Sequence, residues 1–199
     1  MTPTASPIGS RAAPLALALG GDASALRQLG LVLFGSLLVA ASAQVSVPMW
    51  PVPMTLQTLA ISVIGLTMGA RLAAATLVVY LGQGAMGLPV FAGGAAGLPY
   101  LFGPTGGFLV GFVAMAWLTG FIAERGFGRG LPRLFVAAFV PALLLFVPGV
   151  AWLWAVTPLS LEAAVMAGAV PFQIGGLVKS ALAAVIVAGG WQALKRRRG

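Results

Sequence analysis

The chain has 199 residues, of which 60% are hydrophobic and only 7% are charged. Because ordinary soluble domains carry about 25% charged residues, this composition excludes a soluble globular protein and indicates an integral membrane protein, long enough for one compact helical bundle. The net charge of +8 comes from basic residues at the ends of apolar segments, a pattern that argues against nucleic-acid binding. Cysteine and histidine are absent, so no metal or other cofactor is expected.

Residues 1–24 are rich in Thr, Pro, Ser, Gly and Ala and predict a flexible cytoplasmic tail. The apolar stretch after Arg11 faintly resembles a signal peptide, but it is short and interrupted by Pro14, so an uncleaved tail is favoured. Residues 25–195 are expected to form one transmembrane domain, and residues 196–199 a basic cytoplasmic tail. The apolar segments lie near residues 27–46, 55–70, 72–88, 106–123, 134–156 and 172–194.

These six apolar segments are expected to be helices. Several approach the ~17–25 residues that span a bilayer, whereas the second and third are shorter. A segment in lipid must satisfy its own backbone hydrogen bonds, and runs such as residues 77–81 lack the alternation of a barrel strand. The predicted fold class is therefore an all-α membrane protein, a bundle of six transmembrane helices.

The distribution of Lys and Arg predicts the orientation of this bundle. With a cytoplasmic N-terminus and six spans, the outer connections near 47–54, 89–105 and 157–171 receive no basic residue. The inner side receives Arg11, Arg27, Arg71, Arg125, Arg129, Arg133, Lys195, Arg196, Arg197 and Arg198. Because short cytoplasmic loops carry an excess of Lys and Arg, both termini are predicted to be cytoplasmic.

The outer connections are rich in Pro and Gly and are themselves apolar, as at 47–53, 87–94 and 103–107. Irregular backbone near a membrane survives only where protein or a cavity lines it, which predicts outer loops that cap a ligand pocket. The alternative is that Pro and Gly merely end helices at the bilayer surface, and composition alone leaves both open.

Lys179 is the one charged side chain set inside a long apolar run. If the last helix begins near residue 172, the lysine lies about 10 Å below the outer edge of the membrane. A charge at this depth costs free energy, so it indicates function. The functional interpretation is a fixed cation at the floor of an outward-facing pocket, where a ligand anion supplies the countercharge. The alternative is a lysine that reaches outward to headgroups or water.

Other chemistry finds few residues to support it. The acidic residues Asp22, Glu124 and Glu162 lie at or beyond segment ends, so an ion-coupled relay has no obvious carrier. Residues 175–180 fail as a phosphate loop because Val178 precedes the lysine and the run is apolar. A serine nucleophile would lack a base. The chain is therefore not expected to be an enzyme or to hydrolyse ATP by itself.

Three segments stand out as motifs, namely residues 51–59 (PVPMTLQTL), 80–94 (YLGQGAMGLPVFAGG) and 103–112 (GPTGGFLVGF). These segments resemble the BioY family, the biotin-specific substrate-binding (S) component of energy-coupling-factor vitamin transporters. Together with Pro171, Phe172 and Lys179 they make a specific match that covers roughly residues 27–195.

The resemblance implies a six-helix bundle in a bacterial-type inner membrane that captures biotin from outside. Uptake would be driven by a separate transmembrane coupling subunit and two cytoplasmic ATPases, with biotin as the transported ligand rather than a cofactor. The alternative is a stand-alone carrier or facilitator for biotin or another small organic anion. The oligomeric state is left open, a homo-oligomer included.

Two family motifs are matched only in part. Family members often carry Asp-x-x-Lys in the last motif, and here Lys179 matches the lysine while Gly176 stands at the aspartate position. The coupling contact in related subunits uses Ala-x-x-x-Ala on the first helix, for which Ser36 and Ala40 are the nearest equivalents. Such small residues also let helices pack closely within one bundle, and both interpretations stay open.

The chemistry of biotin suggests roles for residues near these motifs. Its carboxylate requires a cation, for which Lys179 is the intramembrane candidate. The apolar tail and ring suit Trp50, Phe91, Phe102, Tyr80 and Met54. The ureido group could be held by Gln57, Thr55, Gln83 or the backbone of Gly93 and Gly94. Lys179 ranks first, followed by Gln57 and Tyr80; for the aromatic and Gln residues, packing within the bundle is the competing interpretation.

Overall fold

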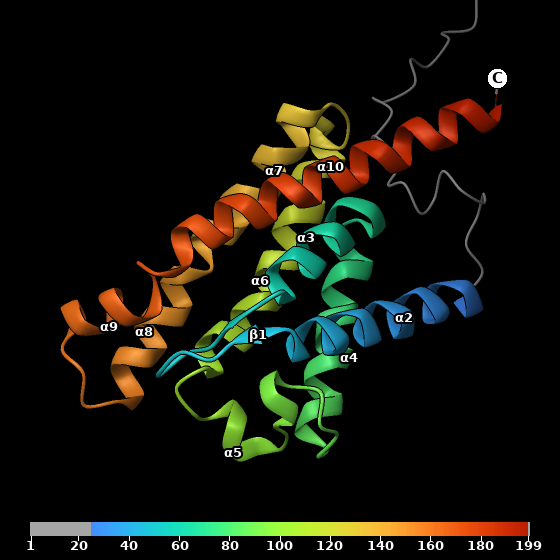
Figure 1. The fold of residues 1–199 in the computed structure, drawn as a ribbon. Coiled ribbons are helices and arrows are strands. Elements are labelled where there is room, and N and C mark those ends of the chain that lie inside the picture. Colours follow the sequence, from blue (N-terminus) through green and yellow to red (C-terminus); the bar gives the residue numbers. More distant parts are fainter. Residues whose placement is uncertain (1–24, 199) are drawn as a thin grey trace, which may run out of the picture.

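The computed structural model describes residues 25–198, and the predictions made for residues 1–24 and 199 lie outside this part of the chain (Figure 1). The described chain is mostly helical. Its principal helices are α2 (Ala25–Gln44), α3 (Gln57–Met68), α4 (Ala70–Ala85), α6 (Gly106–Ile122), α7 (Leu131–Leu144), α8 (Phe146–Val156) and α10 (Phe172–Arg198). Each of the six predicted apolar segments is therefore helical.

Four stretches of the described chain are long and apolar enough to cross a membrane, namely Ala25–Gln44, Gly106–Phe127, Leu131–Val156 and Leu161–Leu194. Helices α3 and α4 have 12 and 16 residues, which is below the usual spanning length of about 17–25. The multi-pass membrane architecture is thus clear. Six complete spans and two cytoplasmic termini stay predictions.

The apolar segment predicted near 134–156 forms two helices rather than one. Helix α7 ends at Leu144 and α8 begins at Phe146. Pro148 has no N–H to bond the carbonyl of Leu144, and its ring crowds that carbonyl, so the regular hydrogen-bond ladder is interrupted here. Leu145 and Phe146, which lie at this break, line the cavity described below.

The outer connections contain short ordered elements. Strands β1 (Ser46–Val47) and β2 (Met54–Thr55) pair antiparallel, and the second connection holds η1 (Ala92–Gly94) and α5 (Leu98–Leu101). The third contains α9 (Leu161–Gly168), a helix not foreseen from the sequence. Its local signal is a serine cap, since the hydroxyl of Ser160 accepts a hydrogen bond of 3.2 Å from the backbone N–H of Ala163.

Helix α6 forms the centre of the bundle and packs against α3, α4, α7 and α8. Small residues make these contacts close: a Cβ at Gly120 would overlap the backbone of Gly69 and Ala70, and one at Gly107 would overlap Trp152. The segment η2 (Ala123–Phe127) follows α6, and the carboxylate of Glu124 accepts a 2.9 Å hydrogen bond from the N–H of Ala70 at the start of α4. An acidic group at a helix N-terminus is favourable.

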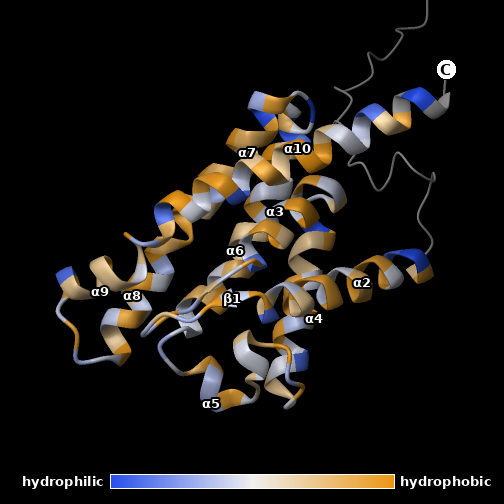
Figure 2. Cartoon of the chain, viewed as in Figure 1, coloured by the Kyte–Doolittle hydropathy of each residue, from blue (hydrophilic) through white to orange (hydrophobic). Residues whose placement is uncertain are grey.

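Large apolar side chains cover the outside of the bundle, including Phe34 and Leu37 on α2 and Val185 and Ile186 on α10. Such an exposed apolar surface is suited to lipid contact. Hydrophilic residues gather at the start of α2, at the connection between α6 and α7 and at the end of α10 (Figure 2). These are the places where the sequence puts its predicted cytoplasmic arginines.

Candidate ligand-binding cavity

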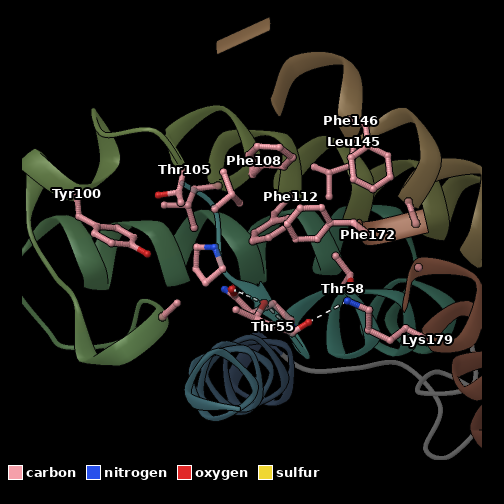
Figure 3. A pocket seen from close by; sticks show the side chains of 17 residues that line it. Thr55, Thr58, Tyr100, Thr105, Phe108, Phe112, Leu145, Phe146, Phe172 and Lys179 are labelled. Carbon is pink, nitrogen blue, oxygen red and sulfur yellow. Dashed lines mark hydrogen bonds between the residues drawn. The ribbon is translucent and has the colours of Figure 1, made fainter. Parts of the chain in front are cut away.

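A cavity of about 690 Å³, its open mouth included, lies between the outer connections and helices α3, α6, α7, α8 and α10 (Figure 3). The lining residues are Val52, Pro53, Thr55, Gln57, Thr58, Ala92, Tyr100, Thr105, Phe108, Leu109, Phe112, Ala142, Leu145, Phe146, Phe172, Gly176 and Lys179. The first two outer connections thus form part of its wall, as expected for loops that cap a pocket.

Lys179 extends from α10 to the wall of this cavity. Its ammonium group donates a 2.9 Å hydrogen bond to the backbone carbonyl of Thr55 in β2, so the side chain is turned toward β2 rather than outward to lipid. No Asp or Glu is among the described residues that line the cavity. The ammonium therefore has a dipole as its protein partner and no carboxylate, which leaves its charge available to an anion.

A chain of hydrogen bonds holds the polar side chains next to Lys179. The hydroxyl of Thr55 donates to the amide oxygen of Gln57 (2.9 Å), and the amide nitrogen of Gln57 donates to the hydroxyl of Tyr80 (2.8 Å). The Tyr80 hydroxyl donates in turn to the carbonyl of Val90 (3.1 Å). Because Gln57 and Tyr80 are buried, these bonds determine the rotamer of Gln57 and which way its amide faces.

The body of the cavity is apolar and aromatic. Phe108 and Phe112 of α6 face Phe146 and Phe172, whose ring centroids are 6.3 Å apart. At the end away from Lys179, Tyr100 and Thr105 present neutral hydroxyl groups (Figure 3). The cavity therefore offers a cation at one end, neutral polar groups at the other and an aromatic middle. This pattern suits an elongated ligand that carries one acidic group.

Of the residues proposed from the sequence, Lys179, Gln57 and Thr55 line the cavity. Tyr80 and Phe91 lie behind its wall and are fully buried. The Phe91 ring meets Tyr80 edge-on at 5.6 Å and stacks on Tyr100 at 5.3 Å. Tyr80 and Phe91 thus support residues that line the cavity, and neither lines it.

The other proposed residues are not brought to the cavity. Trp50 is 84% exposed and Phe102 is 66% exposed, because the predicted loops turn these rings outward. Met54 is in β2 but does not line the cavity. Gly93 and Gly94 do not line it either, and the N–H of Gly94 is used in a 3.0 Å hydrogen bond to the amide oxygen of Gln44.

Gln83 and the small residues of α2 meet at a helix contact rather than at the cavity. The amide nitrogen of Gln83 donates to the hydroxyl of Ser36 (3.2 Å), which donates to the carbonyl of Leu33 (2.9 Å). Ser36 is fully buried, and Ala40 is half-buried against the core. In this structure the small-residue row serves the packing of α2 on α4, one of the two interpretations that the sequence left open.

Several cavity residues were not singled out from the sequence. Tyr100, Phe112 and Phe146 belong to runs in which every neighbour is also apolar, so nothing marks the ring that faces inward. Thr58 and Thr105 do lie inside the segments 51–59 and 103–112. For Thr58 and Thr105, the sequence signal of a cavity residue was a small polar side chain within an apolar motif.

These features define a multi-pass helical membrane protein whose loops cap a cavity with a lysine in its wall. The chain belongs to the BioY family, whose family model matches residues 13–196. Family membership identifies a transporter component, and the chain is not an enzyme.

Two relatives illustrate the similarity. The probable biotin transporter BioY of Pyrococcus horikoshii is 34% identical over 160 residues, covering 80% of this chain and 93% of the relative. The biotin transporter BioY2 of Lactococcus lactis is also 34% identical over 160 residues, covering 80% of this chain and 87% of the relative.

A solved structure has the same fold. It is the crystal structure of the S-component for biotin from an ECF-type ABC transporter, with a TM-score of 0.75 and 22% sequence identity. The match covers 82% of this chain and 89% of that one.

Proposed function

We propose that this chain captures biotin at the outer side of a bacterial-type cytoplasmic membrane, as the substrate-binding component of an energy-coupling-factor transporter. The observation that carries the proposal is the ammonium group of Lys179, which faces an aromatic cavity without an acidic partner among the described residues. The names of the relatives support biotin as the ligand.

The cavity suits the parts of biotin in order along its length. The valerate carboxylate binds the Lys179 ammonium in a charge-assisted hydrogen bond. The alkyl chain and thioether ring contact Phe108, Phe112 and Phe172, and the ureido group bonds to neutral polar groups such as Tyr100 and Thr105. In this arrangement each polar group of the ligand has a partner, which burial requires.

Binding by the purified chain tests the ligand. Titration with biotin in detergent or nanodiscs is expected to give saturable binding at one site, with much weaker binding of other water-soluble vitamins, because the cavity offers one cation between apolar walls. Isothermal titration calorimetry measures the affinity for biotin and for each of the other vitamins. Equal affinity for several unrelated vitamins would contradict biotin specificity.

Uptake is proposed to require a transmembrane coupling subunit and two cytoplasmic ATPases. The coupling subunit would engage the inner side near Arg125, Arg129 and Arg133. Since Ser36 is buried, any contact through α2 would use its exposed apolar residues, such as Phe34 and Leu37.

The expected result of an uptake assay is biotin accumulation only when the coupling module is present. Labelled biotin is supplied to a host that lacks its own biotin transporter and coupling module, and the chain is expressed alone or with the module. Accumulation is expected to be much greater with the module, since a subunit that is not expected to hydrolyse ATP by itself has no energy source of its own. Equal, vigorous uptake by the chain alone would instead favour a stand-alone carrier.

A further inference from the structure

Thr58 lies in the first turn of α3 and lines the cavity on the same wall as Thr55 and Lys179 (Figure 3). Its hydroxyl oxygen is buried and has no hydrogen-bond partner in the described chain. Buried polar atoms are nearly always paired, so an unpaired one requires an explanation.

Several other helical hydroxyls of this chain, although not that of Thr119 in α6, bond backward to the preceding turn. Ser62 donates to the carbonyl of Thr58 (2.8 Å), Thr67 to that of Val63 (2.7 Å) and Thr76 to that of Leu72 (2.8 Å). Thr58 has no such acceptor because α3 begins only one residue earlier. The carbonyl three residues before it, that of Thr55, accepts the ammonium of Lys179. The position of Thr58 at the helix start therefore leaves its hydroxyl free.

The backbone N–H of Thr58, at the start of α3, also lacks an acceptor among the described residues. The N–H of Gln57 donates to the hydroxyl of Thr55 (3.3 Å), and the N–H groups of Leu59 and Ala60 donate to the carbonyl of Leu56 (3.0 and 3.3 Å). For the N–H of Thr58 no acceptor is found within residues 25–198. Free N–H groups and the helix dipole make this end of α3 positive. A hydroxyl, a backbone N–H and an ammonium thus gather on one wall.

We propose that Thr58 is a ligand-binding residue whose hydroxyl donates to the carboxylate that Lys179 neutralises. The inference rests on the proposed function, in which the ligand carries that carboxylate. A carboxylate has two oxygens, so one accepts from the ammonium of Lys179 while the other accepts from Thr58.

The chain offers a matched control for this residue. Thr119 of α6 is a fully buried threonine whose hydroxyl, like that of the half-buried Thr58, has no partner in the described residues. It packs against Gly65 of α3 and does not line the cavity. Replacing either threonine by valine removes an unpaired hydroxyl at nearly constant shape, so both variants are expected to fold and melt close to the unmodified chain.

The test is a biotin titration of the full purified chain and of Thr58→Val, Thr58→Ser and Thr119→Val. Thr58→Val is expected to weaken biotin binding by about tenfold or more, the effect of one hydrogen bond to a charged group. Thr58→Ser, which keeps the hydroxyl, and Thr119→Val are expected to stay within about threefold. If Thr58→Val does not fold, Thr58→Ala is compared with Thr58→Ser in the same way.

Biotinol, in which a hydroxymethyl group replaces the carboxyl group, separates the possible contacts. The loss of affinity caused by Thr58→Val is expected to be large for biotin and small for biotinol. An equal loss for both would overturn the carboxylate assignment. Unchanged biotin affinity in Thr58→Val, with binding intact in the unmodified chain, overturns the role of Thr58 and leaves the proposed function standing. Absence of biotin binding by the unmodified chain overturns both.

Discussion

Replacing Lys179 by alanine is expected to reduce biotin affinity at least about 100-fold while the bundle still folds. Removing one member of a buried ion pair costs about 3–5 kcal/mol, and each 1.4 kcal/mol corresponds to about a tenfold change in affinity. The reason is that the ligand carboxylate would remain in the cavity with no cation near it. Isothermal titration calorimetry on the two purified proteins measures the difference.

The control for this variant is Lys195→Ala, which removes the second lysine of the sequence, directly before the basic tail, and should leave binding unchanged. Biotinol provides a second comparison: the unmodified chain should bind it far more weakly than biotin, whereas Lys179→Ala should bind both alike. If Lys179→Ala kept full affinity for biotin, the lysine would not belong to the binding site. If it lost affinity for both ligands equally, the lysine would bind some other group of biotin than the carboxylate.

Filling the cavity beside Lys179 is expected to block the ligand without disturbing the bundle. Gly176 lines the cavity, and a Cβ built there would meet no heavy atom within 4 Å. In Gly176→Leu the new side chain therefore occupies empty space, where ligand atoms would lie. Biotin affinity is expected to fall at least about 100-fold, since even small overlaps in a packed site cost about 1–3 kcal/mol each. Titration measures the affinity and a thermal melt measures the fold.

Gly189→Leu is the matched control for Gly176→Leu. Gly189 lies in the same helix, is exposed, and also has no heavy atom within 4 Å of an added Cβ. Both substitutions exchange a helical glycine for a better helix former, so their effects on stability should be alike. Only Gly176→Leu should lose biotin. Equal biotin affinity in the two variants would mean that the ligand does not reach the α10 wall of this cavity.

The sequence predicted the helices well because their signal is local. Apolar composition identifies a membrane protein, and the segments near 27–46, 106–123 and 172–194 correspond to α2, α6 and α10. Lipid leaves the backbone no other hydrogen-bond partners, so a long apolar run in a membrane becomes a helix whatever its neighbours are. Lys179 was recognisable for a related reason, since a charge in such a run is costly and needs a purpose.

The sequence was a poor guide to the loop residues around the cavity. Trp50 and Phe91 both lie in Pro- and Gly-rich apolar loops, yet Trp50 is 84% exposed and Phe91 is fully buried. Loop backbone has no period that alternates buried and exposed positions, so the direction of each ring depends on contacts with distant helices. Phe91 is buried because Gly84 of α4 leaves room for its ring.

What the sequence by itself determined is the class of protein, the helical segments, the solitary lysine and the motifs of the family. Only the tertiary structure decided that Lys179 bonds to the backbone of Thr55, 124 residues away along the chain, and that Thr58 lines the same cavity. It also decided that Tyr80 supports the wall and that Ser36 packs inside the bundle. The physical reason is that lipid selects helices segment by segment, whereas a cavity is enclosed by surfaces from many segments, and their pairing depends on how side chains fit across the bundle.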